Sequence, residues 1–315
     1  MNLPQLRALV AVADQGSFTA AADSLGISQS AVSHTLAALE HELALALVIR
    51  SRSGATLTAH GQQAVGHARE ALRRVERISQ DAAVAVGRHR GRLRVAAFPS
   101  AAQLMPPLIA ALGRALPEVA VVLLEGNDSE TQAWLTDRVV DLAVVATLCA
   151  PDGNAATRMT SPTGALLAID RFVAVLDRDH ALAGQDSVRL ADLEDDPFLL
   201  SDGGCEPLLR RLYDAAGVAM RPARRIRDPA TLLAMVQQQL GVTVVPELML
   251  PRAHDLAVIP LTPAAHRALH LVPADERDLS AAGNVLLDLA RHRRRHQPPP
   301  ELDVVASPDR AAPCQ

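Results

Sequence analysis

One short segment near the N-terminus has side chains suited to reading DNA. Ser28, Gln29, Ser30, Ser33 and His34 begin a stretch whose apolar residues recur at helical spacing. On a helix, Ser30 and His34 point away from the apolar stripe, and Gln29 and Ser33 lie at its edges. Small and amide-bearing side chains can enter a major groove, where Gln bonds adenine in two places. An ordinary solvated surface helix has the same kind of polar face, so this face alone supports the two interpretations equally. The surrounding elements must decide between them.

The preceding residues predict two more helices in a DNA-binding arrangement. Apolar residues at helical spacing predict a helix over 4–13, and Ser17 is positioned to cap a second helix over 18–25. Gly26 then provides a tight turn, and Ser28 caps the third helix, which runs to about residue 42. Two helices joined by a short Gly-containing turn are the signature of a helix-turn-helix.

A basic hairpin is predicted immediately after these helices. Residues 47–50 and 55–58 are β-prone, and the four residues between them form a turn. The tip carries Arg50 and Arg52, which would bind phosphates and fix the register on DNA without reading sequence. The hairpin shifts the balance from a solvated helix to a winged helix-turn-helix.

A long helix with a heptad pattern is predicted over 59–87. Its apolar positions alternate at spacings of three and four, a pattern typical of helix pairing. They include the predicted dimerisation residues Val65, Ala68, Leu72, Val75 and Ala82. A helix packed on its own domain is the alternative, but so narrow a stripe favours a dimer, which would present two recognition helices to a two-fold-related site.

Composition agrees with a DNA-binding head on a sensing body. The 315 residues have a net charge of −4 and all 31 basic residues are arginines. Residues 1–91 carry 9 Arg and 7 acidic residues (+2), and residues 92–315 carry 22 and 28 (−6). Three cysteines without paired spacing argue against a disulfide framework. With no signal peptide and no apolar run of about 18 residues, we expect a soluble, cytoplasmic protein without a membrane partner.

The rest of the chain predicts an α/β body. Short apolar strands at 93–98, 119–124 and 141–146 alternate with helical stretches at 104–116 and 130–138, which implies a parallel sheet with helices on its faces. Further strands are expected at 172–176, 198–200, 242–245 and 269–272. Further helices are expected at 207–216, 230–240 and 280–293. In such sheets ligands bind beyond the carboxyl ends of the strands.

These segments together resemble LysR-type transcriptional regulators over about residues 1–294. The head carries the resemblance at 18–25, 28–34, 39–40, Arg50, 57–58 and Gly61; the body carries it at Gly126, 141–143, 180–183, 190–193 and 241–246. Three positions depart from the family pattern. Ala44 and Gln239 stand where the family usually has Gly, and Val48 where it has Phe.

The resemblance implies an α/β fold class with an N-terminal winged helix-turn-helix, a long dimerisation helix and a two-lobed periplasmic-binding-protein-like effector domain. The expected domains are 1–58 (DNA-binding), 59–91 (linker helix and hinge) and 92–295 (effector-binding). Lobe I would take 92–163 and 266–295, lobe II 164–265, and 296–315 would be a Pro-rich disordered tail. The expected partners are double-stranded DNA, a small-molecule effector, further copies of the chain up to a tetramer, and RNA polymerase.

By the same resemblance, three loops line the effector cleft. The expected effector-binding residues are Ser100, Ala101, Ala102, Thr147, Ser201, Asp202 and Gly203. Hydroxyls and helix-start amides suit a carboxylate or an amino acid, although Ser100 and Ser201 could equally be helix caps. Asp202 and Asp228 would repel a dianion, which leaves a neutral or amine-bearing ligand open. Cys149 and Cys205 follow cleft segments, and ordinary small buried residues are a simpler reading of them than a redox pair.

No catalytic set or cofactor motif is found. The chain lacks a Gly-rich phosphate loop, a His-Glu-x-x-His pair and a nucleophile elbow. His292 and His296 are four residues apart, but the arginines between them would oppose a metal ion. We therefore expect a ligand-responsive regulator that binds an inverted-repeat promoter site, with no metal or cofactor. An α/β enzyme with a fused DNA-binding head is the alternative.

Overall fold

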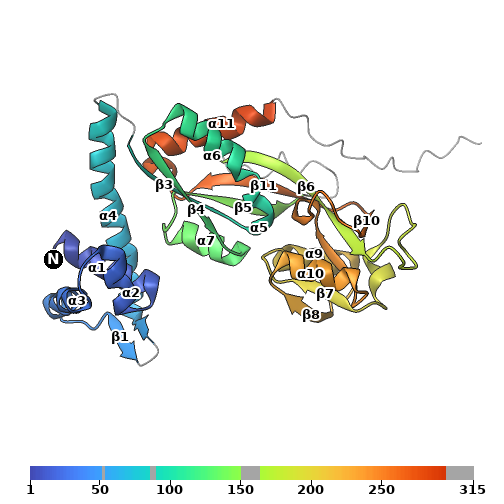
Figure 1. Cartoon of the computed structure of the whole chain (residues 1–315), viewed down its shortest axis with the longest axis horizontal. Helices are drawn as coiled ribbons and strands as arrows, with labels where there is room; N and C mark the ends of the chain where they lie inside the picture. The colour runs from blue at the N-terminus through green and yellow to red at the C-terminus, as the bar shows by residue number, and fades with distance from the viewer. Residues whose placement is uncertain (52–53, 86–89, 150–163, 296–315) are drawn as a thin grey trace, which may run out of the picture.

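The chain begins with three short helices whose ends are fixed by local caps. The computed structural model describes residues 1–51, 54–85, 90–149 and 164–295. The helices are α1 (Leu3–Gln15), α2 (Phe18–Leu25) and α3 (Gln29–Leu43) (Figure 1). Asn2, Ser17 and Ser28 each accept a hydrogen bond from the first turn of the following helix, which satisfies a free backbone N–H. Apolar side chains of all three helices, among them Leu9, Val32 and Leu36, form one buried core.

The predicted wing is present as an antiparallel hairpin of β1 (Val48–Ser51) and β2 (Gly54–Leu57). The backbone N–H of Ala55 donates to the carbonyl of Gly16 at 2.7 Å, which ties the hairpin to the turn between α1 and α2. Just after the hairpin, Gly61 packs directly against the backbone of Leu47. A Cβ there would lie 2.0 Å from the carbonyl oxygen of Leu47, so only Gly fits.

Part of the apolar stripe of the linker helix α4 (Ala59–Ala85) packs against the DNA-binding head. Val65 and Ala68 are 2% and 1% exposed and belong to the head core, and Leu72 packs against that core. Val65 and Ala68 therefore pack on their own domain, the alternative that the sequence left open, and leave little surface for a second copy. Further along the helix, Val75 is half-buried and Ala82 is exposed, and the large apolar side chain of Ile78 is 69% exposed.

Ion pairs join α4 to the body. Arg74 pairs with Asp278 at 3.2 Å, and Glu70 pairs with Arg138 at 2.8 Å. Arg77 donates to the backbone carbonyl of Leu279 at 2.6 Å. The arginines that lie off the heptad stripe therefore hold the linker helix against the first lobe.

The first lobe is a sheet covered by helices on both faces. Its strands are β3 (Gly91–Ala97), β4 (Val119–Glu125), β5 (Leu142–Leu148), β11 (His266–Pro273) and the first half of β6 (Ala165–Leu176). As predicted, β3 runs parallel to β4 and β5, whereas β11 is antiparallel to β5 and β6. The helices are α5 (Pro99–Ala102), α6 (Met105–Ala115), α7 (Asp128–Thr136) and α11 (Ala281–Arg295).

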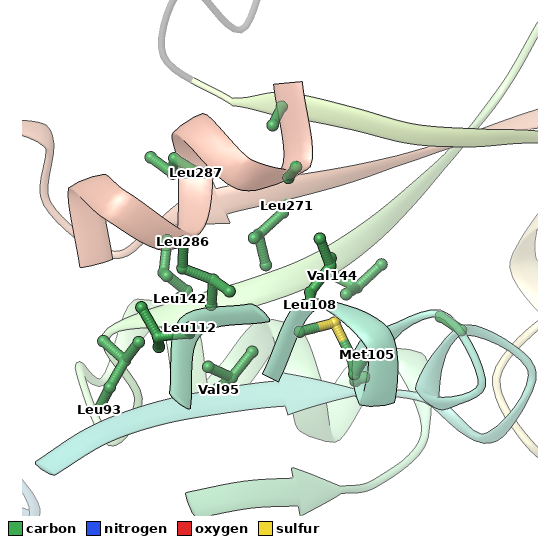
Figure 2. Packing of buried hydrophobic residues seen from close by; sticks show 14 of the residues in the cluster. Leu93, Val95, Met105, Leu108, Leu112, Leu142, Val144, Leu271, Leu286 and Leu287 are labelled. Atoms are coloured by element: carbon green, nitrogen blue, oxygen red, sulfur yellow. The ribbon is translucent and has the colours of Figure 1, made fainter. Parts of the chain in front are cut away.

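The two faces of this sheet have separate cores. On one face, Leu108 and Leu112 of α6 and Leu286 of α11 pack over Val95 and Leu271 (Figure 2). On the other face, α7 covers a smaller core around Ala96 and Ala143. This packing fixes the carboxyl ends of β3 and β4, from which the loops toward the second lobe emerge.

The second lobe is built on the far half of β6. Beyond Arg171 that strand leaves β11 and pairs with β9 (Thr243–Pro246) and β10 (Ala257–Pro260). The lobe adds a parallel pair, β7 (Phe198–Ser201) and β8 (Pro222–Ile226), and the helices α9 (Glu206–Ala216) and α10 (Pro229–Gln237). Short 3₁₀ turns lie at Leu190–Leu193 and Glu247–Met249 in this lobe, and a third lies at Glu276–Asp278, after β11 in the first lobe.

The strand pairing moves one predicted boundary. Residues 165–171 pair with β11 and belong to the first lobe, although the sequence assigned them to the second. One continuous strand therefore passes from the first lobe to the second (Figure 1). Within the described residues, no helix combines the length and the apolar character needed to cross a lipid bilayer.

Candidate DNA-binding face and effector cleft

Helix α3 presents the predicted polar face to solvent. Val32, Leu36 and Leu39 are at most 1% exposed and anchor the helix in the head core. On the opposite side Gln29 and His34 are exposed, as are Ser28 and Ser30. The hydroxyls of Ser28 and Ser30 lie 2.9 Å apart, and Ser28 also caps the helix. The first two turns therefore offer small polar groups that project clear of the domain, as direct readout of a major groove requires.

Arg50 of the wing strand β1 is held against this helix. The Arg50 guanidinium donates from Nη1 to the hydroxyl of Ser33 at 3.0 Å and lies over the Phe18 ring, 4.3 Å from its centroid. Its side chain is nevertheless exposed. Holding a cation in one place beside a helix start lowers the entropy that binding a phosphate would cost. Arg52, the second predicted wing residue, lies outside the described residues.

A small cavity lies between the two lobes. It has a volume of about 20 Å³ and is lined from the first lobe by Phe98, Ser100, Asp128 and Arg267, and from the second by Ser201 and Cys205, among others. A single water molecule needs roughly 10–15 Å³ on this measure. In this arrangement of the lobes the cavity therefore holds no more than a molecule about the size of water.

Arg267 forms a buried ion pair at the wall of the cavity. It and Asp170 are direct cross-strand neighbours on β11 and β6, and both side chains are 2% exposed. The guanidinium donates to Asp170 Oδ2 from Nε at 2.9 Å and from Nη2 at 2.7 Å. Nη2 also donates to the hydroxyl of Ser100 at 2.8 Å. This arrangement satisfies two of the three guanidinium nitrogens with groups of the protein.

Two further titratable groups line the cavity. Burial raises the pKa of Asp128, and nearby Arg267 offsets that rise only in part. Burial likewise raises the pKa of the Cys205 thiol to about 11, so the sulfur is protonated at neutral pH. Neither Asp128 nor Cys205 was among the residues predicted for effector binding.

The lobes touch each other beside these groups. A Cβ on Gly204 would lie 2.4 Å from the backbone nitrogen of Asp128, so a side chain there would collide with the first lobe. Arg227 of the second lobe pairs with Glu130 of the first at 3.2 Å. Gln103 also donates across the gap to the carbonyl of Leu248 at 3.1 Å. The cleft is thus closed by contacts that a larger ligand would have to part.

Three of the predicted cleft residues line the cavity, and the others do not. Ser100, Ser201 and Gly203 line it. Ala101 is fully buried, and neither it nor its neighbour Ala102 lines the cavity. Asp202 is 52% exposed and lies 3.7 Å from Arg225, outside the cavity.

Strand geometry explains why Thr147 does not line this cavity. Successive residues of a strand point to opposite faces, and on β5 it is Ala146 that lines the cavity in place of Thr147. Sequence reasoning also missed Arg267, because nothing local indicates that a charged residue of the last strand, β11, pairs with β6. Asp128 had a usable signal, since it follows the second strand at the edge where ligands bind.

Among the described residues, no group of three or more His, Cys, Asp or Glu side chains is placed to hold a metal ion.

Comparison with known proteins finds two family matches, one for each end of the chain. Residues 3–62 match the family described as "Bacterial regulatory helix-turn-helix protein, lysR family", and residues 87–295 match "LysR substrate binding domain". YvbU of Bacillus subtilis, named an uncharacterized HTH-type transcriptional regulator, is 30% identical over 300 residues. That match covers 92% of this chain and 98% of the relative.

Solved structures share the fold. Full-length OxyR from Pseudomonas aeruginosa superposes with a TM-score of 0.65 at 22% identity, covering 92% of this chain and 98% of that one. CbnR in complex with its target DNA superposes with a TM-score of 0.60 at 22% identity, covering 93% and 99%. The relatives are named as transcriptional regulators, and the chain is a regulator of that kind rather than an enzyme. The chain belongs to the LysR family of ligand-responsive, DNA-binding transcriptional regulators.

Proposed function

We propose that the chain binds an inverted-repeat promoter site as a dimer or tetramer, and that a small molecule in the interlobe cleft changes this binding. The observation that carries the DNA-binding part is the exposed start of α3, where Gln29, Ser30 and His34 project beside the anchored Arg50. In this role Gln29, Ser30 and His34 read base edges, and Ser28, Ser33 and Arg50 set the position on the backbone. Arg52 would add a phosphate contact from the wing.

The dimer is proposed to form along the part of α4 that the head does not use. Val75, Ile78 and Ala82 lie beyond the head core, and Ile78 exposes most of its apolar side chain to water. A second copy packed there would remove that surface from solvent. Two heads related by a two-fold axis would then place two α3 helices on successive major grooves.

The sensing part rests on the cavity and on the contacts that close it. A ligand that enters between Ser100 and Ser201 must separate Gly204 from Asp128 or replace the Arg227–Glu130 pair. Because α4 is bound to the first lobe through Arg74 and Arg138, a change in lobe arrangement can reach the heads. We propose that RNA polymerase responds to the resulting change in how the heads bind DNA.

Salt-titrated binding to specific and random duplexes tests the DNA-binding part. We expect His34→Ala to weaken binding to the specific duplex by about 5- to 100-fold, the range for one lost base contact, and to leave random duplex binding unchanged. Arg50→Ala should weaken both and reduce the salt slope by about 1. His41→Ala, two turns further along the same helix, is the matched control and should behave as wild type. Equal losses on both duplexes for His34→Ala would contradict the assignment of α3.

A further inference from the structure

We propose that the effector of the interlobe cavity carries a positively charged amine, and that the Asp128 carboxylate binds it. The inference rests on the proposed function of that cavity as the effector site. It decides a question that the sequence left open, between a carboxylate and an amine-bearing ligand.

The first step is that Arg267, the cation of the cavity, is already neutralised. Its Nε and Nη2 both donate to Asp170, and Nη2 also donates to Ser100. Both charged side chains are 2% exposed, so the pair acts inside the protein as a neutral unit. An acidic ligand would have only Nη1 of Arg267 to bind, or would have to displace Asp170.

The second step is that Asp128 has no such partner. It lines the same cavity, and its carboxylate makes no hydrogen bond or ion pair within the described part of the chain. Burial disfavours its charged form, and Arg267 compensates for this incompletely. When Asp128 is ionised, the Asp170, Arg267 and Asp128 groups together carry one negative charge at the cavity wall. A ligand ammonium supplies the missing countercharge, whereas a ligand carboxylate meets repulsion.

The other acidic groups near the cavity have partners of their own. Glu130 pairs with Arg227 at 3.2 Å, and Asp202 lies 3.7 Å from Arg225. Asp228 accepts hydrogen bonds from the backbone and hydroxyl of Thr231 at the start of α10. None of these three lines the cavity. Asp128 is thus the carboxylate best placed to select a ligand by charge.

The position of Asp128 also connects binding to lobe movement. Gly204 of the second lobe packs directly against the backbone of Asp128. The cavity of about 20 Å³ is too small for an amine of several heavy atoms. An ammonium group bound at Asp128 therefore lies at the contact that must open, and recognition of charge and separation of the lobes occur at one place.

Calorimetric titration of the full chain with small amines and matched acids tests the inference. The amines are n-propylamine, 1,4-diaminobutane and alaninamide; the acids are propionate, succinate and N-acetylalanine. We expect at least one amine and none of the acids to bind wild type. Asp128→Asn should weaken that amine at least tenfold. Glu125→Gln, which removes the same charge from an exposed neighbouring position, should leave it unchanged.

Three results would overturn the proposal: binding of acids in place of amines, equal amine affinity in wild type and Asp128→Asn, or no binding by any amine. Protection of promoter DNA is measured on the same samples. If wild type protects no sequence, the proposed regulatory function fails. If wild type and Asp128→Asn protect DNA alike but amines fail to bind, only the assignment of the ligand class fails.

Discussion

Removing one partner of the buried Arg267–Asp170 pair should destabilise the effector domain severely. In Asp170→Asn the guanidinium keeps its charge and its 2% exposure, but it loses the carboxylate that both Nε and Nη2 contact. An uncompensated buried charge of this kind costs about 3–5 kcal/mol. The entropy of unfolding is about 2.1 cal/mol/K per residue, or roughly 0.4 kcal/mol/K for a domain of roughly 200 residues. The melting temperature of the effector domain should therefore fall by about 7–12 °C.

Differential scanning calorimetry of the full chain measures this change. The double variant Asp170→Leu with Arg267→Met removes both charges and should recover most of the loss, since apolar replacement of a buried pair is often neutral. Asp255→Asn is the control. It breaks the exposed pair with Arg178 in the second lobe of the same effector domain and should shift the transition by no more than about 2 °C. A melting temperature within about 2 °C of wild type for Asp170→Asn, or no recovery in the double variant, would refute the reasoning.

Three further predictions follow from single residues. Ala44 ends α3 at a φ of 51°, so Ala44→Gly should stabilise the head by about 0.5–1 kcal/mol and raise its calorimetric transition; an unchanged or lower transition contradicts this. Cys205, with its pKa near 11, should be alkylated roughly a hundredfold more slowly at pH 8 in the folded than in the urea-unfolded chain; peptide mass spectrometry measures both rates, and similar rates would refute it. Amine binding should weaken as pH falls through the raised pKa of Asp128, because protonation removes the carboxylate charge; calorimetric titrations at several pH values should show this, and affinity that is constant down to pH 4 would count against it.

The head was predictable from sequence because its structure is determined locally. The caps Ser17 and Ser28 and the turn at Gly26 lie within a few residues of the helices they delimit, and the helices begin where these residues predict. The wing followed from β-prone runs on either side of a turn. The departure at Ala44 did not change this arrangement, because the backbone adopts the left-handed conformation there without Gly.

Features that depend on pairing across long sequence separations were not predictable. The sequence suggested a strand only at 172–176, but β6 begins at Ala165 because its first half pairs with β11, about 100 residues later. The same pairing brings Asp170 opposite Arg267 and buries both, whereas isolated charged residues read as exposed. The linker helix shows the converse limit. A regular apolar stripe indicates that a face is buried, but the sequence does not show whether the head or a second copy covers Val65 and Ala68.

Nuclease footprinting of the full chain on the DNA upstream of its own gene tests whether α3 reads DNA. We expect protection of an inverted repeat whose half-sites are centred about one helical turn, or a multiple of it, apart. We also expect that His34→Ala loses this protection, whereas His41→Ala keeps it. Protection with no preferred sequence, or a specific footprint that His34→Ala leaves intact, would contradict the assignment of α3 as the element that reads DNA.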